Sequence, residues 1–346
     1  MTMLSYAFYR LPYSYSYTLI ETDKEPLLLN NLDGLENESG FLIAPFMDDD
    51  AHPLILIRPD KISRVNLSVN QDATMKCDTS TEQYESVPDE SYETVFGRFH
   101  DAVQKGRFKK LVLARTKVAS FDKCDLLPLF ERACHLYPRL MIMMFSTPMS
   151  GTWIMASPEI LVEGKGKAFH TIALAGTMKW HEGFMEWDSK NRDEQAVVAK
   201  YIEYSISPLS KDVVKDGPVS MRAGDLAHLR TDFRFHLNED VGTGALLSSL
   251  HPTPAVCGFP RQEAKMFIND NEGMQRSYYC GFAGPVGMDD ETHLYVSLRC
   301  ARLEDIRDGK YVWRLFAGGG IMPDSDCLSE WKETEMKFKT IENVLQ

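Results

Sequence analysis

The sequence has no pair of cysteines with the CxxC spacing, although it contains seven cysteines in 346 residues. This absence excludes zinc knuckles and the thioredoxin type of redox motif. An odd number of cysteines in a chain of this length is typical of a reducing compartment. We therefore expect the cysteines to be reduced.

Long apolar runs are also missing. No stretch approaches the ~20 apolar residues that are needed to span a membrane. The first 26 residues are aromatic but are interrupted by Arg10, Pro12 and several serines, so they lack the continuous apolar segment of a signal peptide. We therefore expect a cytoplasmic protein without a membrane partner.

Positive charge is scarce, because 38 Lys and Arg residues face 50 Asp and Glu residues, a net charge of −12 at pH 7. This balance disfavours a nucleic-acid binder that relies on phosphate contacts. An anionic small molecule would need local cations or a metal ion. The 44% hydrophobic content is enough for a well-buried core, in one large domain or two.

The pattern of predicted elements indicates an α+β fold. Short β-rich stretches dominate residues 1–90, which we interpret as an N-terminal region packed on a catalytic region at 91–346. The spacing between the late strands is typical of hairpins and predicts largely antiparallel sheet with helices against it. Helices are predicted at 91–105, near 126–137, at 189–206, at 261–269 and at 329–345. A loop is predicted at 70–91, and strands are predicted on both sides of 250–260.

The helix expected at 329–345, SEWKETEMKFKTIENVL, carries charges on its apolar face. Extended backward at steps of three and four residues, the C-terminal apolar stripe reads Lys337, Glu333 and Glu330. A carboxylate on such a stripe is costly to desolvate unless it is paired, hydrogen-bonded or bound to a metal.

The helix expected at 189–206 repeats this feature. Glu194 lies one turn before the apolar pair Val197 and Val198, and Asn191 lies one further step back. Acidic residues also favour the first turn of a helix, where they meet the helix dipole and free N–H groups. The helix-start explanation and a ligand-binding explanation both remain open at this stage.

Two further stretches can carry chemistry. KKLVLAR is apolar on both faces of a strand, and periodicity alone leaves open whether Lys109 or Lys110 is buried; a buried lysine can act as a base near neutrality. LFAGGGI (315–321) ends in three glycines, which allow a ligand to approach bare backbone N–H groups. It matches neither a Walker loop nor the GxGxxG dinucleotide motif.

In this order, nine stretches resemble the chorismate-utilising enzymes over roughly residues 95–346. The stretches are KLVLAR, SPEILVE with TIALAGT, NRDEQAVV, LAHLRTDF, LHPTPAVCGFP, RSYYCGFAGPVG, SLRCARL, LFAGGGI and SEWKETEMK. Within the family the sequence is most similar to isochorismate synthases. Lys110 stands where those enzymes place the base that activates water, and Ala175 stands where aminodeoxychorismate synthases carry a nucleophilic lysine.

The resemblance implies a Mg²⁺ site between two facing helices. Glu194 and Glu333 would hold the ion, with Glu330 and Asn191 in the shell behind, directly or through water. Hard oxygen ligands and retained waters are what Mg²⁺ requires. The ion would bridge to the ring carboxylate of chorismate.

The resemblance also implies how the rest of the substrate is held. Arg299 and Tyr279 would grip the enolpyruvyl carboxylate, since a guanidinium binds a carboxylate through two hydrogen bonds. Other residues would complete the substrate contacts: Lys337 at the ring carboxylate, backbone N–H groups at Gly318 and Gly320, and Thr177 and His251.

The implied reaction adds water at C2 of chorismate, expels the C4 hydroxyl and shifts the ring double bonds. Lys110 would deprotonate the water, and Glu159 would protonate the departing hydroxyl. These roles require a lysine that spends time neutral and a carboxyl that keeps its proton, and burial shifts both pKa values in the needed direction.

Alternatives remain within and outside this activity. A salicylate synthase would add pyruvate elimination at the same site, an anthranilate-type subunit would need an ammonia source, and a catalytically silent protein would only bind chorismate or Mg²⁺. Gln195 stands where many relatives have His, and AGGGI replaces the commoner AGAGI. We expect a monomer, and the residues favour neither menaquinone nor a catechol siderophore as the destination of the product.

Overall fold

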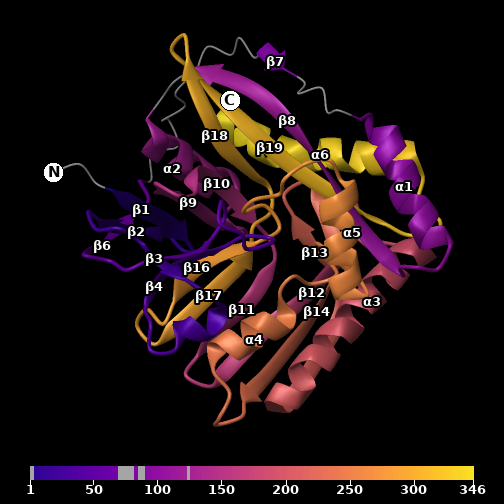
Figure 1. Cartoon of the computed structure of the whole chain (residues 1–346), viewed down its shortest axis with the longest axis horizontal. Coiled ribbons are helices and arrows are strands. Elements are labelled where there is room, and N and C mark those ends of the chain that lie inside the picture. Colours follow the sequence, from indigo (N-terminus) through magenta and orange to yellow (C-terminus); the bar gives the residue numbers. More distant parts are fainter. Residues whose placement is uncertain (1–3, 69–81, 85–89, 123–124) are drawn as a thin grey trace.

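The computed structural model describes residues 4–68, 82–84, 90–122 and 125–346. Two large β-sheets, with helices against them, make up these residues (Figure 1). Every strand pair within the described residues is antiparallel. The predicted α+β fold of antiparallel sheets flanked by helices is therefore confirmed.

The first sheet has ten strands. In spatial order they are β15 (Gly258–Phe259), β8 (Lys110–Asp122), β19 (Lys310–Ile321), β18 (Cys300–Arg307), β10 (Gly151–Ser157), β9 (Met141–Thr147), β1 (Ser5–Arg10), β2 (Ser16–Thr22) and β6 (Lys61–Asn66), with β7 (Glu82–Tyr84) also paired to β8.

The second sheet has nine strands. In spatial order they are β13 (Ser210–Ala223), β14 (Leu226–Leu237), β12 (Ala168–Lys179), β11 (Ile160–Lys165), β17 (Glu291–Val296), β16 (Phe282–Val286), β4 (Gly40–Ala44), β5 (Leu54–Ile57) and β3 (Leu27–Leu29).

The helices divide between the two sheets. Helices α2 and α6 pack on the first sheet, α3 and α4 pack on the second, and α1 and α5 contact β8 (Figure 1). Their bounds are α1 (Tyr92–Gln104), α2 (Leu126–Leu136), α3 (Ser189–Ile206), α4 (Thr243–Leu250), α5 (Arg261–Asn271) and α6 (Cys327–Leu345), with short 3₁₀ turns at Leu32–Leu35 and Ser207–Leu209.

Strands from the N-terminal region extend both sheets. Strands β1, β2 and β6 end the first sheet and β3 to β5 end the second, so the first 66 residues share both sheets with the rest of the chain. The division at residue 90 stays a prediction. Most of the loop expected at 70–91 lies outside the described residues.

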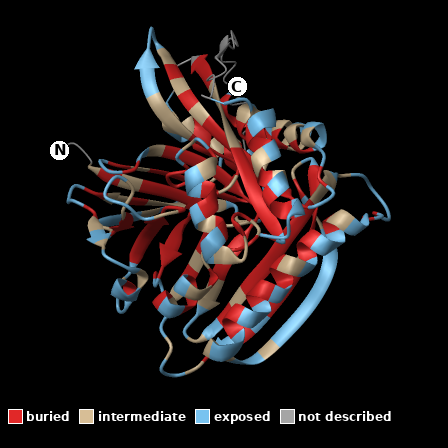
Figure 2. Cartoon of the chain, turned by 45° about the vertical axis from the view of Figure 1, so that its right-hand side comes forward, coloured by how far each residue is buried: buried red, intermediate tan, exposed pale blue. Residues whose placement is uncertain are grey.

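The period-two alternation of β9 shows how the first sheet is buried on both faces. Met141, Met143 and Phe145 join an apolar cluster that includes residues of the second sheet, whereas Ile142 and Met144 join a cluster with α2 and α6. Successive side chains of a strand point to opposite faces. The core is therefore layered, with buried residues along the strands of both sheets (Figure 2).

The structure departs from the predicted elements around residues 207–260. The sequence pattern does not predict strand β13, because SKDVVKDGPVSMRA lacks a buried face and most of its residues are exposed (Figure 2). Lysines and a proline on an edge strand oppose pairing with another chain. Helix α4 ends at the first residue of LHPTPAVCGFP and α5 begins directly after its last residue, so the expected bracketing by strands is wrong on both sides. Within the stretch lies only the two-residue β15.

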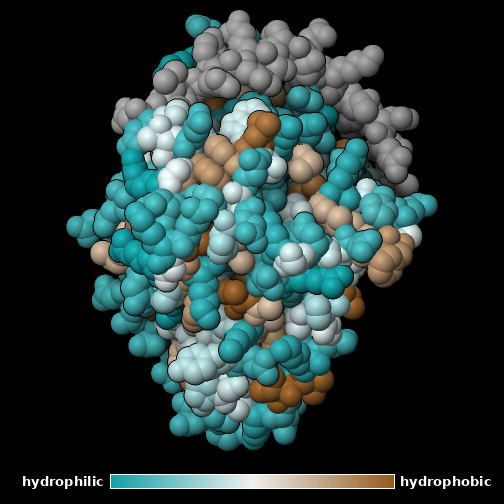
Figure 3. Space-filling model, turned by 90° about the vertical axis from the view of Figure 1, so that its right-hand side faces the viewer, coloured by the Kyte–Doolittle hydropathy of each residue, from teal (hydrophilic) through white to brown (hydrophobic). Residues whose placement is uncertain are grey.

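The face drawn in Figure 3 is mainly hydrophilic, with hydrophobic residues in small separate patches. Scattered exposed apolar side chains of this kind are normal for a folded protein surface. None of the helices in the described residues is long and apolar enough to cross a membrane.

Candidate active site

A cavity with about 610 Å³ of space not filled by atoms lies where β8, β12, β14 and β19 meet α3 and α6. Eight of the residues that the sequence assigns to the site line it: Glu159, Thr177, Glu194, Tyr279, Arg299, Gly318, Gly320 and Lys337. The remaining wall is largely apolar and includes Val112, Leu174, Ala175, Val256 and Phe316. A concave, mostly apolar pocket with a few convergent polar groups is the usual form of a small-molecule site.

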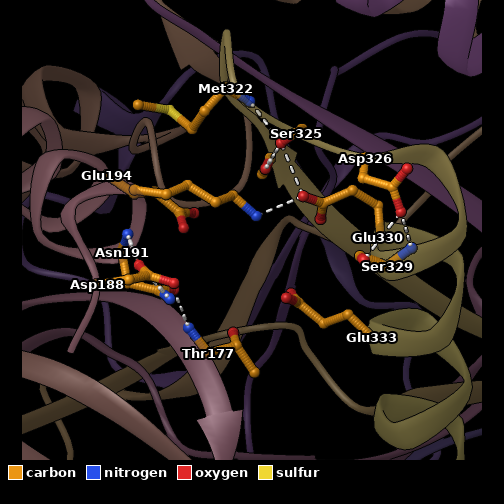
Figure 4. A network of polar contacts seen from close by, with 12 residues as sticks. Thr177, Asp188, Asn191, Glu194, Met322, Ser325, Asp326, Ser329, Glu330 and Glu333 are labelled. Carbon is orange, nitrogen blue, oxygen red and sulfur yellow. Dashed lines mark hydrogen bonds and ion pairs between the residues drawn. The ribbon is translucent and has the colours of Figure 1, made fainter. Parts of the chain in front are cut away.

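The N-terminal halves of two helices bring the carboxylates together. Asp188 caps α3 by accepting a hydrogen bond from the backbone of Asn191, and Asp326 caps α6 in the same way at Ser329. Each cap fixes where its helix begins. As a result Glu194 of α3 faces Glu330 and Glu333 of α6 across the site (Figure 4).

The glycines of β19 allow this close approach. A Cβ atom on Gly320 would overlap Glu194 Oε1 and lie 2.8 Å from Lys110 Cε. A Cβ atom on Gly319 would lie 3.1 Å from Glu330 Oε2. The charged side chains thus pack directly against the backbone of β19 at these glycines. Whether Gly318 and Gly320 also donate N–H groups to a ligand stays a prediction.

Each carboxylate has a lysine partner. Lys110 Nζ lies 2.9 Å from Glu194 Oε1, and neither side chain is more than 11% exposed. Lys337 Nζ lies 2.6 Å from Glu333 Oε1 and also donates to the carbonyl of Gly318. These pairs balance charges that would be very costly to bury alone.

The third pair joins the two helices directly, since Lys190 of α3 bonds Glu330 of α6. Ser325 Oγ donates to the same Glu330 oxygen at 2.7 Å, while the other oxygen is buried without a hydrogen bond. Burial and the negative charge of Glu333 raise the pKa of Glu330. For Glu333, burial opposes ionisation but Lys337 outweighs it, so its pKa is lowered.

The donor set suits a hard divalent cation. As the side chains lie, no group of three or more His, Cys, Asp or Glu residues within the described residues is arranged to hold a metal ion. The lysines occupy the carboxylate oxygens instead. Glu194, Glu333 and the unbonded oxygen of Glu330 nevertheless supply the oxygen ligands that Mg²⁺ prefers, from two facing helices.

Of the two adjacent lysines, Lys110 is buried and Lys109 is exposed. Apart from the ion pair with Glu194, Lys110 Nζ makes no hydrogen bond among the described residues. Lys110 is not among the residues that line the cavity, whereas its ion-pair partner Glu194 is.

A buried ion pair supports the strand that carries Lys110. Glu272 accepts from the backbone N–H of Ala114 at 2.7 Å, and Arg276 donates to the carbonyl of Val112 at 2.8 Å. Arg276 also donates two hydrogen bonds to the Glu272 carboxylate, both at 2.6 Å. These side chains satisfy backbone groups of β8 that would otherwise be buried without a partner.

Asn191 positions the end of β12. Its Oδ1 accepts from the backbone N–H of Thr177 at 2.9 Å, and its Nδ2 donates to Asp188. Gly176, with φ of +72°, lies directly against Asn191. The amide is therefore engaged in holding the chain, so its predicted role near the metal would be indirect.

Arg299 is buried and makes no ion pair within the described residues. It donates to Thr340 Oγ1 and to His228 Nε2, both at 3.1 Å. His228 is neutral, because burial and then Arg299 lower its pKa to about 3, and its other ring nitrogen donates to the carbonyl of Gly176. An unpaired buried guanidinium that lines a cavity is suited to receive an anion.

Glu159 is a buried carboxyl group whose environment favours the protonated form. Burial raises its pKa to about 8, although the charges of Lys110 and Lys337 and the nearby Thr253 act in the other direction. The residue is 3% exposed. Near neutral pH it therefore holds a proton that it can give up.

The structure does not place His251 at this cavity. Its ring bonds the carbonyl of Pro45 at 3.0 Å and packs edge-on against Phe282. The histidine lies at the end of α4 and faces the N-terminal region, so its predicted role in substrate binding stays a prediction that this geometry does not support. Ala255 and Val256 are the residues of that turn that line the cavity.

Sequence reasoning missed three contributors to the site: His228, Lys190 and Thr253. His228 stands in LAHLRTDF and Lys190 directly precedes NRDEQAVV, so both signals were present. The pattern of a single element shows which residues share a face, but it does not reveal a partner such as Arg299 from another part of the chain.

Comparisons with known proteins identify the family of this chain. The sequence model of the family described as "Chorismate binding enzyme" matches residues 41–346. The salicylate biosynthesis isochorismate synthase of Pseudomonas aeruginosa is 32% identical over 257 residues, which cover 70% of this chain and 52% of that protein. The chain therefore belongs to the family of chorismate-binding enzymes. It spans about half the length of the curated relatives that it matches first.

Solved structures share the fold. The structure of MenF, the menaquinone-specific isochorismate synthase from Escherichia coli, has a TM-score of 0.79 at 20% identity, with 99% of this chain and 89% of that one covered. Anthranilate synthase component I from Streptococcus pneumoniae has a TM-score of 0.67 at 15% identity, with 98% and 91% covered. The fold alone therefore does not distinguish these activities.

The raised pKa of Glu159 predicts how stability depends on pH. The folded state holds this proton more tightly than the unfolded chain, so the stabilisation is complete below about pH 4.3 and is lost as pH rises through about 8. Relative to Glu159→Gln, the wild type should lose up to ~5 kcal/mol of unfolding free energy over this range. Urea denaturation at pH 5 and pH 8.5 measures the difference.

The exposed Glu182 provides a matched control, and Glu182→Gln should keep the pH dependence of the wild type. An identical pH dependence for the wild type and Glu159→Gln would show that Glu159 is ionised at neutral pH.

Proposed function

We propose that this protein is an isochorismate synthase, which converts chorismate into isochorismate. One observation carries the proposal: a buried acid that keeps its proton, Glu159, and a buried lysine, Lys110, flank a cavity whose guanidinium, Arg299, has no ion-pair partner among the described residues. The names of the relatives point to the same activity.

The cavity suits a substrate with two carboxylates. Arg299 and Tyr279 would bind the enolpyruvyl carboxylate, and the ring carboxylate would lie toward Lys337 and the acidic cluster. The apolar wall, including Leu174 and Phe316, would pack against the ring and exclude bulk water.

Lys110 and Glu159 would then divide the proton transfers. Lys110 removes a proton from the water that adds at C2, and Glu159 delivers a proton to the C4 hydroxyl as its bond to carbon breaks. The double bonds shift between these carbons, so the ring gains one hydroxyl and loses one. Lys110 ends with an extra proton and Glu159 lacks one, so a proton must return between them before the next turnover.

A Mg²⁺ ion would be held by Glu194 and Glu333, with Glu330 and its partner Lys190 behind. When bound, the ion would supply positive charge for the ring carboxylate of the substrate. Glu194 would leave Lys110 when it serves as a ligand. That movement would release the amine from its ion pair with Glu194.

Two relatives of this activity define the alternatives. A salicylate synthase would also eliminate pyruvate. This alternative is considered because the Pseudomonas relative is named a salicylate biosynthesis isochorismate synthase. An anthranilate-type enzyme would use ammonia. Ala175, a buried apolar residue in the cavity wall, offers no amine nucleophile there.

Incubation with chorismate and Mg²⁺, followed by chromatography, tests the proposal. We expect isochorismate as the product, with and without added ammonium salts, because the base activates water. Salicylate with pyruvate would favour the salicylate synthase. Anthranilate or another aminated product would indicate an ammonia-using enzyme of the family. Unchanged chorismate would indicate a protein that binds chorismate without converting it.

The two adjacent lysines provide a sharp test of the base. Lys110→Ala should lose at least ~10²-fold in kcat, the lower range for a positioned general base. Mg²⁺ binding should not weaken, because the substitution releases Glu194 from its ion pair. Steady-state kinetics and a metal titration measure the two effects.

Lys109→Ala is the control, since Lys109 is exposed directly before the same strand and the variant should stay within a few-fold of the wild type. Loss of activity in Lys109→Ala but not in Lys110→Ala would reject the assignment.

Removal of a carboxylate tests the metal site. Glu194→Gln and Glu333→Gln should abolish turnover, and Mg²⁺ should raise the melting temperature of the wild type but not of these variants, since binding to the folded state stabilises it. EDTA should silence the wild type, and excess Mg²⁺ should restore it. Glu203→Gln, an exposed position on α3, should respond to Mg²⁺ as the wild type does. Full activity after chelation would overturn the metal assignment.

A further inference from the structure

A second hollow, with about 970 Å³ of space not filled by atoms, lies between α6 and the ends of β12, β13 and β14. We call it the antechamber. The residues that define it for this argument are Lys179, Trp180, Arg222, Asp225, Lys339 and Thr340. None of them belongs to the catalytic groups described above.

The antechamber continues the cavity along shared elements. On β12, Thr177 lines the cavity and Lys179 lines the antechamber; on α6, Lys337 lines the first and Thr340 the second. The hydroxyl of Thr340 accepts a hydrogen bond from Arg299, which lines the cavity. The walls of the two hollows are therefore in contact through the Arg299–Thr340 hydrogen bond.

The antechamber concentrates positive charge on a protein whose net charge is −12. Lys179, Arg222 and Lys339 line it together with one acidic residue, Asp225. These three cations make no ion pair within the described residues, in contrast to Lys110, Lys190 and Lys337 of the candidate active site. Unpaired cations in a hollow attract anions.

Trp180 adds an apolar surface beside these charges. Its ring lies 5.6 Å from the Arg222 guanidinium, which also donates to the carbonyl of Gly224 and is thereby fixed. The backbone N–H of Trp180 bonds the carbonyl of Asp225, which holds the end of β12 against the β13–β14 turn. The antechamber thus offers a flat ring and cations together, as a small cyclic carboxylate requires.

We propose that the antechamber is a binding site for the dicarboxylate substrate on its way into the cavity. The inference rests on the proposed function, because it takes a dianion as the substrate. An acidic protein repels a dianion at long range, and a local cationic surface reverses that field at the entrance. The substrate is held there by Lys179, Arg222 and Lys339 until Arg299 receives its carboxylate.

Charge reversal at Lys179 and Lys339 tests this site. Stopped-flow tryptophan fluorescence with chorismate and Mg²⁺ measures the association and dissociation rates, and Trp180→Phe identifies the signal that comes from the antechamber. In Lys179→Glu and Lys339→Glu the association rate should fall about tenfold at low salt, within the range known for electrostatic steering. The deficit should shrink at high ionic strength, and the dissociation rate should stay near its wild-type value.

Lys200→Glu is the matched control, because Lys200 is an exposed lysine on α3 and the change in net charge is the same. Its association rate should stay within about twofold of the wild type, because an isolated surface charge contributes little to steering. An effect on the dissociation rate alone would show that the lysines act on substrate already in the cavity, which overturns the antechamber.

The failures of the two proposals are distinguishable. Wild-type protein that does not bind chorismate overturns the proposed function and this inference together. Wild-type protein that converts chorismate, while Lys179→Glu and Lys339→Glu associate as fast as Lys200→Glu at every salt concentration, overturns this inference alone.

Discussion

The site depends on pairs of opposite charge that are buried against the three consecutive glycines of β19. Lys110 and Glu194 meet over Gly320, at a place where a single added methyl group would overlap the carboxylate. Removing one partner of a buried ion pair leaves an uncompensated charge, at a cost of ~3–5 kcal/mol. Because the three carboxylates also repel one another, their lysines and the glycines of β19 have to be present together.

The same pairs connect the two sheets. Helix α3 packs on the second sheet and α6 on the first, and Lys190 of α3 bonds Glu330 of α6. Lys110 of β8 in the first sheet pairs with Glu194 of α3. The relative position of the sheets therefore sets how far apart the carboxylates lie. A ligand that recruits Glu194 and Glu333 would act on the contact between the two halves of the fold.

The sequence pattern of a single helix or strand predicts which residues share one of its faces. The helical period placed Glu194 and Glu333 on apolar stripes, and both lie at the site. The period of the strand left Lys109 and Lys110 equivalent, because β8 is buried on both faces, and only the tertiary structure distinguishes them. Strand β13 was missed because no face of it is buried. His251 was chosen from a conspicuous turn, whereas the histidine that supports Arg299 stood in a less conspicuous strand.

Because the fold is shared by enzymes with different reactions, a few side chains at the cavity must determine the chemistry. Anthranilate synthase component I has the same architecture at 15% identity, so the arrangement of sheets and helices does not by itself select the nucleophile. What differs must lie in the residues at the cavity. Here Ala175 is a small apolar residue of the cavity wall, and the buried amine of Lys110 is paired with Glu194.

A lysine in place of Ala175 would add another ammonium to a cavity that already contains Arg299 and Lys337. The carboxylates of Glu194 and Glu333 could not balance it without loss, because each is already paired with a lysine. A buried charge without a partner would be costly, so such a lysine would have to lose its proton or displace an existing pair. The charge balance of the cavity thus disfavours a further amine at position 175.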